Sequence, residues 1–493
     1  MAEKINKINI NDEYALRLAK LKKIANAYPA NTMRTMTLSS FLTDFKKFLK
    51  NKKKLTLAGR IFSLRLQGGS CFLHFGDSSG RVQAFLRKDN LAAGEYEQFK
   101  NLVDQGDFIE LSGQAFLTKT KEPTILVSTW RLLSKALLPL PDEYYGLKDP
   151  DLRYRKRYLD LLVNPDIKKI FDLRSQVIRL TREFFDNLAY TEVDTPVLQA
   201  IATGATAKPF STHHNALDMD LYLRVAPELY LKRLIIGGYD KVYEIARCFR
   251  NEGIDHQHNP EFSQIEAYEA YQDYEGYMKL VEKFMESLAK KLFAKTKVKN
   301  GNDVLDFKTP YPRVDFKQAL DQALKIDIDK TSDKQLMSLA EQAHLGPDKT
   351  WGRGKLLDEL YKKFVRSKII QPTFIINHPL EISPLAKKIA DRPNYVERFQ
   401  LVIKTAELCN AFSELNDPLD QEQRFKEQKI LQERGDEEAQ GSDDDFVEAL
   451  KYGLPPTAGL GIGIDRLVML LADVENIKEV ILFPTMRPKA GNQ

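Results

Sequence analysis

The spacing of apolar residues changes abruptly at Leu55, and this change divides the chain into parts that must fold differently. From residue 12 to residue 53, apolar side chains recur about every four residues, which is typical of helices. From Leu55 to Ser134 they recur every second residue, which is typical of strands with one buried face. Turns rich in glycine, proline and aspartate separate five such runs, which are Leu55–Phe62, Cys71–Phe75, Arg81–Leu86, Phe108–Phe116 and Thr124–Leu133.

These five runs, with a helical stretch near Leu91–Val103, predict a small closed barrel over residues 55–136. An OB-type barrel fits best, although the pattern alone also fits another small barrel. Residues 1–54 are predicted to be an N-terminal helical extension. Its end carries a cluster of lysines, which is either an ordinary solvated surface or a contact for phosphates: Lys46, Lys47, Lys50, Lys52, Lys53 and Lys54.

The remaining chain predicts a second and larger domain. Residues 137–157 contain Pro139, Pro141 and Pro150 and are interpreted as a linker. Residues 158–493 open with a long amphipathic helix and then alternate strands with helices. Their weakly patterned part, about 290–392, is interpreted as an insertion.

Composition excludes several classes of protein. No run of 18 apolar residues exists, so we expect no membrane span. The three cysteines, Cys71, Cys248 and Cys409, lie far apart, which argues against a disulfide framework or a zinc ribbon and favours the cytoplasm. The formal charge is 74 − 69 = +5, which permits a nucleic-acid partner without requiring one.

The segment from Tyr243 to Tyr271 carries the most suggestive polar residues. Two strand-like runs, Val242–Phe249 and Phe262–Tyr271, flank a polar loop. Arg250 ends the first run and could clamp a phosphate. Glu266 and Tyr268 lie two apart on the second run, so they share a face and could hold an ammonium group. Ion pairs between neighbouring strands explain the same residues equally well.

Two further segments are ambiguous when taken alone. In Gly459–Leu470 (GLGIGIDRLVML) the glycines could let a flat group such as a nucleobase lie against a strand, with Arg466 near it, although tight packing of strand on helix is the simpler interpretation. In Ala406–Asp417 (AELCNAFSELND) Glu407, Asn410 and Glu414 could serve a cation, or form the solvated face of a helix.

Taken in order, these segments resemble the class II aminoacyl-tRNA synthetases. Residues 192–198 resemble the end of motif 1, FRNE with HNPEF resembles motif 2, and GLGIGIDR resembles motif 3. The barrel resembles the anticodon-binding domain of the subgroup that charges lysine, aspartate and asparagine. The resemblance covers essentially the whole chain. It implies an α+β fold, an OB-fold barrel followed by a catalytic domain on an antiparallel sheet flanked by helices, and a homodimer with Pro196 at its interface.

Within that subgroup the sequence resembles the lysine type. APELYLK (226–232) has Glu228 where aspartate and asparagine enzymes tend to have glutamine, and NAFSELNDP contains Glu414. Together with Glu266 these carboxylates predict a pocket suited to two ammonium groups. An aspartyl or asparaginyl enzyme remains the nearest alternative. A shortened relative that lysylates elongation factor P would lack the barrel, and a non-catalytic RNA-binding protein would have lost Arg250 or Arg466.

The resemblance implies ATP-dependent formation of lysyl-adenylate and transfer to the 3′ end of tRNA(Lys). Residues implied to bind ATP are Arg250, Glu252, His258, Asn259, Phe262, Glu407 and Arg466, with Arg250, Arg466 and His258 acting in catalysis. Residues implied to bind lysine are Gly204, Glu228, Glu266, Tyr268, Asn410 and Glu414. Those implied to contact the anticodon are Phe72, Gln83 and Arg65. Those implied to hold Mg²⁺ are Glu407, Glu414 and Gln400, although related enzymes usually have a glutamate where Gln400 stands.

Overall fold

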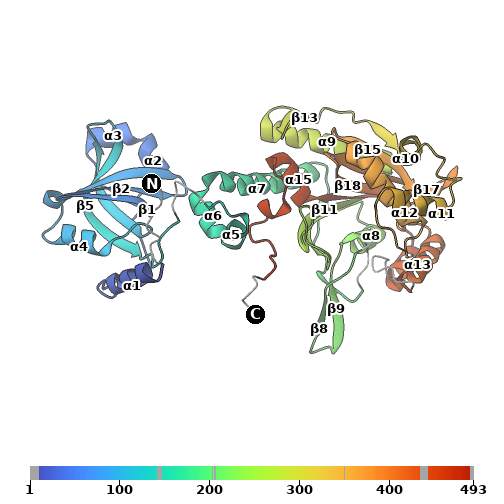
Figure 1. The fold of residues 1–493 in the computed structure, drawn as a ribbon, viewed down its shortest axis with the longest axis horizontal. Coiled ribbons are helices and arrows are strands. Elements are labelled where there is room, and N and C mark those ends of the chain that lie inside the picture. Colours follow the sequence, from blue (N-terminus) through green and yellow to red (C-terminus); the bar gives the residue numbers. More distant parts are fainter. Residues whose placement is uncertain are drawn as a thin grey trace. The chain divides into compact units, whose positions relative to one another are not determined.

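The computed structural model describes residues 10–141, 147–201, 204, 207–348, 350–433 and 442–488. The chain forms two compact units, residues 1–148 and residues 149–493 (Figure 1). Within the described residues, no helix is long and apolar enough to cross a membrane. Residues 1–9 of the predicted extension and 142–146 of the predicted linker lie outside the description.

The first unit is built on the predicted barrel. Its strands are β1 (Leu55–Gln67), β2 (Ser70–Asp77), β3 (Gly80–Arg87), β4 (Phe108–Leu117) and β5 (Pro123–Ser134), closed in the order β1-β2-β3-β5-β4. Helix α4 (Glu95–Leu102) lies between β3 and β4 in the chain. Alternate residues of each strand, such as Cys71, Leu73 and Phe75, fill the interior. All five predicted strands are therefore confirmed, as is the barrel.

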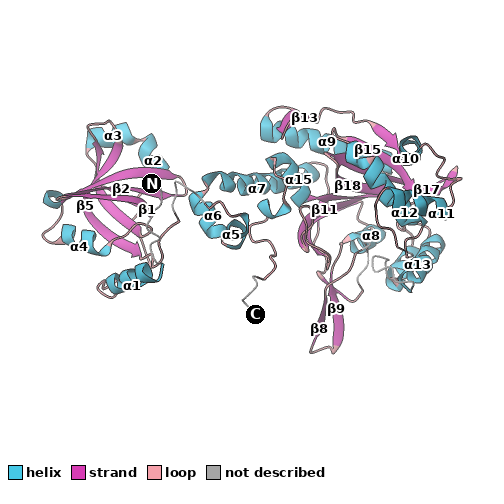
Figure 2. Ribbon diagram, viewed as in Figure 1, coloured by secondary structure: helices cyan, strands magenta, loops and turns pink. Residues whose placement is uncertain are grey.

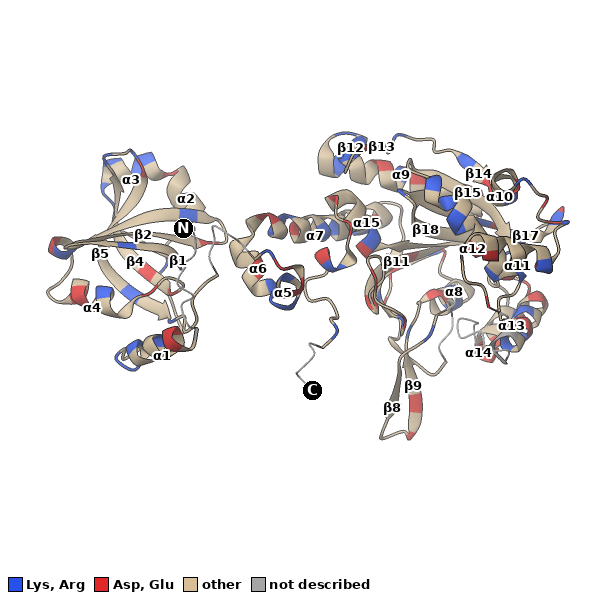
Figure 3. Ribbon diagram, viewed as in Figure 1, with Lys and Arg blue, Asp and Glu red and all other residues tan. Residues whose placement is uncertain are grey.

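The region before the barrel is less helical than its apolar spacing predicts. It forms α1 (Ile10–Leu21), α2 (Leu38–Thr43) and α3 (Phe45–Asn51), and residues 22–37 between α1 and α2 carry no helix. Phe41, Phe45 and Phe48 pack on the barrel core. Pro29 interrupts the pattern because proline cannot continue a helix. The predicted lysine cluster is solvent-exposed on and after α3 (Figure 3).

The second unit is built around a mixed sheet. Its strand order is β14-β15-β17-β18-β19-β11-β10-β6, with β16 (Lys388–Ile389) paired to β17. The central strands are antiparallel: β10 (Lys241–Phe249), β11 (Glu261–Ala270), β19 (Thr457–Gly463), β18 (Ala406–Ser413) and β17 (Arg392–Ile403). The edge strands β6 (Thr191–Glu192) and β14 (Arg313–Asp315) each pair in parallel. The predicted fold class is confirmed, with these two parallel edges added to the antiparallel sheet.

The two faces of this sheet carry different kinds of side chain, because successive side chains along a strand point to opposite faces. On one face Ile265, Leu460 and Ala411 pack against α7 (Pro165–Asp186), α9 (Tyr274–Phe293) and α15 (Ile464–Ala472). On the other face lie the polar side chains of the predicted site. Helices α8 (Glu228–Ile236) and α14 (Asp444–Lys451) share a smaller apolar cluster with this second face.

The remaining elements surround this frame. Helices α5 (Pro150–Arg155) and α6 (Arg157–Val163) precede α7, so the predicted linker 137–157 contains a helix. Strands β7 (Leu198–Gln199), β8 (Ser211–His214) and β9 (Met219–Leu223) form a small separate sheet, and β8 and β9 project from the body as a hairpin (Figure 2). Helix α13 (Pro418–Glu433) follows β18.

The weakly patterned segment 290–392 is not separate from the main sheet. Strands β14 and β15 (Thr373–Pro379) extend the sheet, and β15 pairs with β17. Between them α10 (Phe316–Leu324), α11 (Asp333–Gln342) and α12 (Arg353–Phe364) enclose a core of their own around Phe316 and Leu360. Strands β12 (Lys297–Asn300) and β13 (Asp303–Asp306) form a short hairpin. The sequence pattern was weak here because these elements are short and mixed in type.

Candidate functional site

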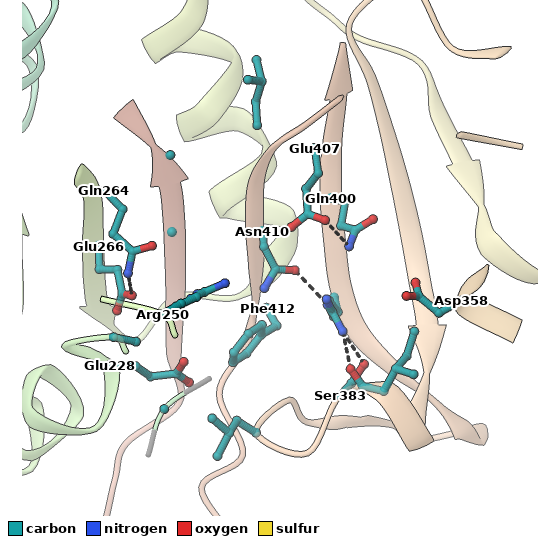
Figure 4. Close-up of a pocket in the computed structure, with 18 of the residues that line it drawn as sticks. Glu228, Arg250, Gln264, Glu266, Asp358, Ser383, Gln400, Glu407, Asn410 and Phe412 are labelled. Atoms are coloured by element: carbon teal, nitrogen blue, oxygen red, sulfur yellow. Dashed lines mark hydrogen bonds between the residues drawn. The ribbon is translucent and has the colours of Figure 1, made fainter. Parts of the chain in front are cut away.

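The glycines of β19 form the floor of a cavity on the polar face of the sheet. Gly459 pairs with Tyr268 of β11 on one side and with Phe412 of β18 on the other. Gly461 lies in the same way between Glu266 and Asn410. Because the central strand carries no side chains at these positions, the flanking ones border a cavity of about 710 Å³. Figure 4 shows Glu228, Glu266 and Arg250 on one side of it and Asn410, Gln400 and Glu407 on the other.

The two floor glycines have different surroundings. A Cβ at Gly459 would overlap Glu414 Oε1 and the ring of Tyr268. A Cβ at Gly461 would come no closer than 3.7 Å to Glu266 Cγ. The missing side chain at Gly459 makes room for Glu414 and Tyr268 of this chain, and that at Gly461 leaves open space.

Three buried carboxylates gather at one end of the cavity. Glu228 opens α8, Glu266 lies on β11, and Glu414 follows the end of β18. Gln264 Nε2 donates to Glu266 Oε1 at 2.6 Å, and the Tyr268 hydroxyl donates to Glu266 Oε2 at 3.1 Å. Burial and the nearby charge of Glu228 raise the pKa of Glu266 to about 8. Burial also raises the pKa of Glu414 well above its ordinary value, against the opposing effect of Lys232.

Lys232 supplies positive charge to this acidic end. It lies one helical turn after Glu228, and its Nζ is 2.6 Å from Glu228 Oε1. The same Nζ forms an ion pair with Glu414 Oε2. Burial alone would lower the pKa of Lys232, but the two carboxylates raise it above its ordinary value, so the lysine is charged.

Gly204 borders the acidic end from the loop before β8. Its φ of +97° is in the region that residues with a Cβ rarely adopt. A Cβ there would lie 3.5 Å from the Cβ atoms of Ala226 and Glu228. The backbone conformation, more than the space, explains a glycine at this position.

Positive charge gathers around the loop that joins β10 to β11. Arg250 follows β10, and its backbone N–H donates to Pro260 O at 2.8 Å, which closes the base of the loop. Arg250 lies over the Phe262 ring, with 5.1 Å between the guanidinium carbon and the ring centroid. Burial and the nearby charges of Arg250 and Arg366 lower the pKa of Arg466, while Glu407 opposes them. Arginine nevertheless stays protonated in proteins, so this part of the cavity attracts anions.

His258 is held in one tautomer between Arg466 and Asp255. Arg466 Nη2 lies 2.9 Å from His258 Nε2, and a guanidinium can only donate. Nε2 therefore accepts, and the proton is on Nδ1, which lies 2.7 Å from Asp255 Oδ2. The Arg466 side chain also donates to Glu407 O at 3.2 Å. The loop and the start of α15 are thus tied together at the cavity.

The remaining predicted residues of this loop also line the cavity. Glu252 is exposed at its rim. Asn259 is buried, and its Nδ2 donates to Glu261 O at 2.6 Å. Its Oδ1 has no hydrogen-bond partner within the part of the chain that the structure describes. Phe262 presents its ring beneath Arg250.

A β-bulge places Glu407 and Asn410 on the same side of β18. The pairing with β17 shifts between Leu401 and Val402, so that Leu408 is an extra residue. Without it, an odd spacing of three would put these side chains on opposite faces. Segment 406–413 is therefore a strand, and the alternative of a solvated helix face is wrong.

Glu407 has Gln400 as its neighbour on β17. Gln400 Nε2 donates to Glu407 Oε2 at 2.9 Å, and the Tyr361 hydroxyl donates to Gln400 Oε1 at 3.3 Å. Asn410 accepts from Arg398 Nε at 2.8 Å. Glu414 does not join this group, because seven residues of strand separate it from Glu407, on the order of 20 Å. The expectation that Glu414 holds a metal ion together with Glu407 does not fit this geometry.

No ready-made metal site is present in the described ranges. No group of three or more histidine, cysteine, aspartate or glutamate side chains there is arranged to hold a metal ion. The carboxylate of Glu407 beside the Gln400 amide is the only predicted metal-binding pair that the described structure brings together.

Most of the predicted site residues meet at this one cavity. It is lined by Gly204, Glu228, Arg250, Glu252, His258, Asn259, Phe262, Glu266, Tyr268, Gln400, Glu407, Asn410 and Arg466. Glu414 lies behind Gly459. Sequence reasoning missed Lys232, Arg398, Asp358 and Arg366. Only Arg398 had a usable signal, because it alternates with Gln400 on one strand and so shares its face. Lys232 lies in a helical segment, and no feature of the sequence there indicates that its side chain is buried.

The predicted anticodon residues lie together on the outer face of the barrel. Arg65 of β1 pairs with Phe72 of β2, which in turn pairs with Phe85 of β3. The rings of Phe72 and Phe85 are stacked with centroids 4.1 Å apart. Gln83, two residues before Phe85 on the same face, donates to Glu122 Oε2 at 2.8 Å. Phe72 is half-buried rather than part of the barrel core.

Comparison with known proteins gives the family. Residues 149–487 match the family model described as tRNA synthetases class II (D, K and N). The chain belongs to this family. Residues 55–133 match a second model, the OB-fold nucleic acid binding domain, so the family's catalytic part here follows a barrel of that type.

Similar proteins in this family are named lysine–tRNA ligases. The one from Thermoanaerobacter sp. (strain X514) is 47% identical over 92% of this chain and 91% of its own length. Those from Halalkalibacterium halodurans and Syntrophomonas wolfei are each 44% identical, covering 98% and 99% of both chains respectively. The similarity thus extends over nearly the full length of both chains in each comparison.

The packing at Gly459 generates a first prediction. Gly459→Ala should lower the free energy of unfolding of the second unit by about 1–3 kcal/mol, because its methyl group would overlap Glu414 and Tyr268. Gly461→Ala is the matched control, since its methyl group has room. Urea unfolding followed by circular dichroism measures both. Equal effects of the two substitutions would contradict this description of the cavity floor.

Proposed function

We propose that the chain joins L-lysine to tRNA(Lys) in two steps driven by ATP. The observation that carries this proposal is the pairing of two regions of opposite charge in one cavity. Three buried carboxylates gather in one part of it, and Arg250 and Arg466 also line it. An amino acid with two ammonium groups suits the first region, and the phosphates of ATP suit the second. The names of the relatives agree with this choice.

The first step is an in-line displacement at phosphorus. A carboxylate oxygen of lysine attacks the α-phosphate of ATP, the bond to the β-phosphate breaks, and pyrophosphate leaves with the electron pair. No side chain has to act as a covalent nucleophile. Arg250 stabilises the negative charge that develops at the α-phosphate, and Arg466 does so nearer the γ-phosphate. His258, neutral and fixed by Asp255, helps hold Arg466 in place.

The second step transfers the lysyl group to RNA. The terminal ribose hydroxyl of tRNA attacks the carbonyl carbon of lysyl-adenylate, the mixed anhydride bond breaks, and AMP leaves, its phosphate taking up the hydroxyl proton. Positioning and charge neutralisation account for both steps. The adenine of ATP would stack on Phe262, with Glu252 and Asn259 next to it; the unpartnered Asn259 Oδ1 supports a ligand at this place.

Lysine itself would lie across the glycine floor. We assign its α-amino group to Gly204 and Glu228, and its carboxylate to Asn410 and Arg250. The ε-ammonium group would meet Tyr268 and Glu414, with Glu266 next to them. Aspartate fits poorly, because its side chain would add negative charge to a region with three carboxylates.

Magnesium is part of the proposal because it would neutralise the phosphates of ATP. Glu407 offers one carboxylate at the cavity, and Mg²⁺ in such sites is commonly held by one or two carboxylates together with substrate phosphates. The residues present thus fit a metal ion carried largely by ATP. Gln400 keeps Glu407 oriented through its amide without adding charge.

The barrel would bind the anticodon of tRNA(Lys). Its outer face presents the stacked pair Phe72 and Phe85 beside Gln83 and the exposed Arg65. Aromatic rings on an open strand face suit unstacked bases of single-stranded RNA, and amide groups can read their edges. The exposed lysines that follow α3 would meet the RNA backbone.

We also propose that the chain is a homodimer that works in the cytoplasm, where tRNA is charged for translation. Apolar side chains gather in exposed positions just after α7, in the segment that resembles motif 1: Leu188, Val197, Leu198 and Ile201. Pro196, in the middle of this segment, is also exposed. An exposed apolar group of this kind is typical of an interface. Sedimentation equilibrium of the full chain, which separates monomer from dimer, measures this directly.

The activity is tested by pyrophosphate exchange into ATP. Lysine should support exchange, whereas aspartate and asparagine should support at least about 100-fold less. The acidic pocket repels the aspartate side chain, and the asparagine side chain has no positive charge to pair with the carboxylates. Arg250→Ala should lose exchange while still folding. Exchange with aspartate but not lysine would replace this proposal with an aspartyl enzyme, and tRNA binding without any exchange would indicate a non-catalytic RNA-binding protein.

The metal proposal is tested with Gln400→Glu. A second carboxylate beside Glu407 should lower the Mg²⁺ concentration for half-maximal exchange about tenfold, since ligand charge sets affinity for hard cations. Binding of Mn²⁺ measured by electron paramagnetic resonance gives a readout that does not depend on activity. An unchanged metal requirement and unchanged Mn²⁺ binding would show that position 400 has no part in holding the ion.

The barrel proposal is tested with Phe72→Ala. Loss of base stacking should weaken tRNA(Lys) binding by about 1–3 kcal/mol and leave lysine-dependent exchange unchanged. Phe108→Ala is a matched control, because Phe108 is an exposed barrel aromatic that contacts Arg60 instead of the Phe72 stack. If both variants charge tRNA with the same KM as the unmodified protein, Phe72 does not read the anticodon.

A further inference from the structure

Lys232 places an ammonium group of the chain itself against the carboxylates at the acidic end of the cavity. Only 1% of its surface is exposed, and the side chain of Glu414 has no exposed surface. Its Nζ contacts one oxygen of each of two carboxylates, Glu228 Oε1 and Glu414 Oε2. The rings of Phe412 and Phe446 enclose it, with centroids 5.4 Å and 5.8 Å from Nζ. A lysine buried this deeply persists only with such partners.

The contacts of Lys232 leave the opposite carboxylate oxygens available. Glu414 Oε1 is buried against Gly459 and has no hydrogen-bond partner among the residues described. Gly459 and Tyr268, which enclose this oxygen, both line the cavity. Glu228 likewise lines the cavity, while its Oε1 is held by Lys232. Lys232 thus holds one oxygen of each carboxylate; Glu228 itself borders the cavity, and Glu414 Oε1 lies directly behind Gly459 and Tyr268, which border it.

The charges at this end balance for a ligand with two ammonium groups. Glu228, Glu266 and Glu414 carry three negative charges when all are ionised, and Lys232 carries one positive charge. Glu244, the next carboxylate on β10, is already paired with Arg224 at 2.5 Å. Arg250 and Arg398 lie on the side assigned to the ligand carboxylate and phosphates. With all three carboxylates ionised, as two bound ammonium groups favour, two negative charges remain for the α- and ε-ammonium groups of lysine.

We propose that Lys232 is a resident counter-ion and a positioning residue that selects for lysine. It neutralises one of the three carboxylates, fixes Glu228 and Glu414, and leaves two negative charges for the two ammonium groups of the substrate. The proposal rests on the proposed function and deepens it. Without Lys232, Glu228 and Glu414 would repel each other, and the pocket would take up a proton in place of the missing charge.

The test replaces Lys232 with methionine, which keeps the length of the side chain and removes the charge. Lys232→Met should raise the KM for lysine in pyrophosphate exchange at least about tenfold, equal to 1.4 kcal/mol, with kcat changed much less. Calorimetry of lysine binding in two buffers of different ionisation enthalpy counts protons. The variant should release the same number of protons as the unmodified protein, because the proton that it holds in place of the Lys232 charge stays in the pocket when lysine binds.

Lys241→Met is the matched control. Lys241 forms an ion pair at 2.9 Å with Glu269, and neither residue lines the cavity. It should leave both the KM and the proton count unchanged. Lys232→Gln repeats the test with a polar neutral side chain if the methionine variant does not fold.

The unmodified protein provides a test that needs no variant. Norleucine, which lacks the ε-ammonium group, should bind more weakly than lysine and release about one proton fewer. Equal proton release for the two ligands would overturn the charge balance. A variant at Lys232 with unchanged KM would reduce Lys232 to a structural role, extra protons released by the variant would contradict the charge balance, and a lower KM would show that Lys232 competes with the substrate. Absence of lysine-dependent exchange in the unmodified protein would instead refute the proposed function.

Discussion

Burial of three carboxylates on one face of the central sheet is the constraint on which the rest of the site depends. Charged groups lose their hydration inside a protein, and this loss is tolerable only when partners replace the water. Lys232 replaces it for Glu228 and Glu414, and hydrogen bonds from Gln264 and Tyr268 replace part of it for Glu266. The three carboxylates, when ionised, still carry more negative charge than Lys232 neutralises, and a cationic ligand can neutralise the rest.

The sheet supplies the geometry for this arrangement. Side-chain alternation puts one apolar face against α7, α9 and α15 and turns the opposite face toward the cavity. Gly459 and Gly461 carry no side chains on that face, so the side chains of β11 and β18 border a cavity above β19. The bulge at Leu408 then brings Glu407 onto the same face as Asn410. A single sheet thus presents an acidic region and a cationic region to one ligand space.

Much of this architecture could be predicted from local pattern. The period of two from Leu55 gave the five barrel strands, and the motif that contains Arg250 gave the β10–β11 pair, because both are local in sequence. Features that depend on tertiary packing could not be predicted. Nothing in the sequence marks Lys232 as buried, since lysines at helical spacing are usually solvated. Residues 406–413 form a strand instead of a helix, so Glu407 and Glu414 lie on the order of 20 Å apart, and an interpretation from their spacing alone misplaced Glu414.

The central claim is that the acidic end of the cavity receives both ammonium groups of lysine while Lys232 stays in place. A crystal structure of the full chain with bound lysine and a non-hydrolysable ATP analogue tests it most directly. We expect the ε-ammonium within hydrogen-bonding distance of Glu414 Oε1, the α-ammonium at Glu228, and Lys232 Nζ still between the two carboxylates. Lysine bound elsewhere in the cavity, or Lys232 displaced from Glu414 by the substrate, would contradict the claim.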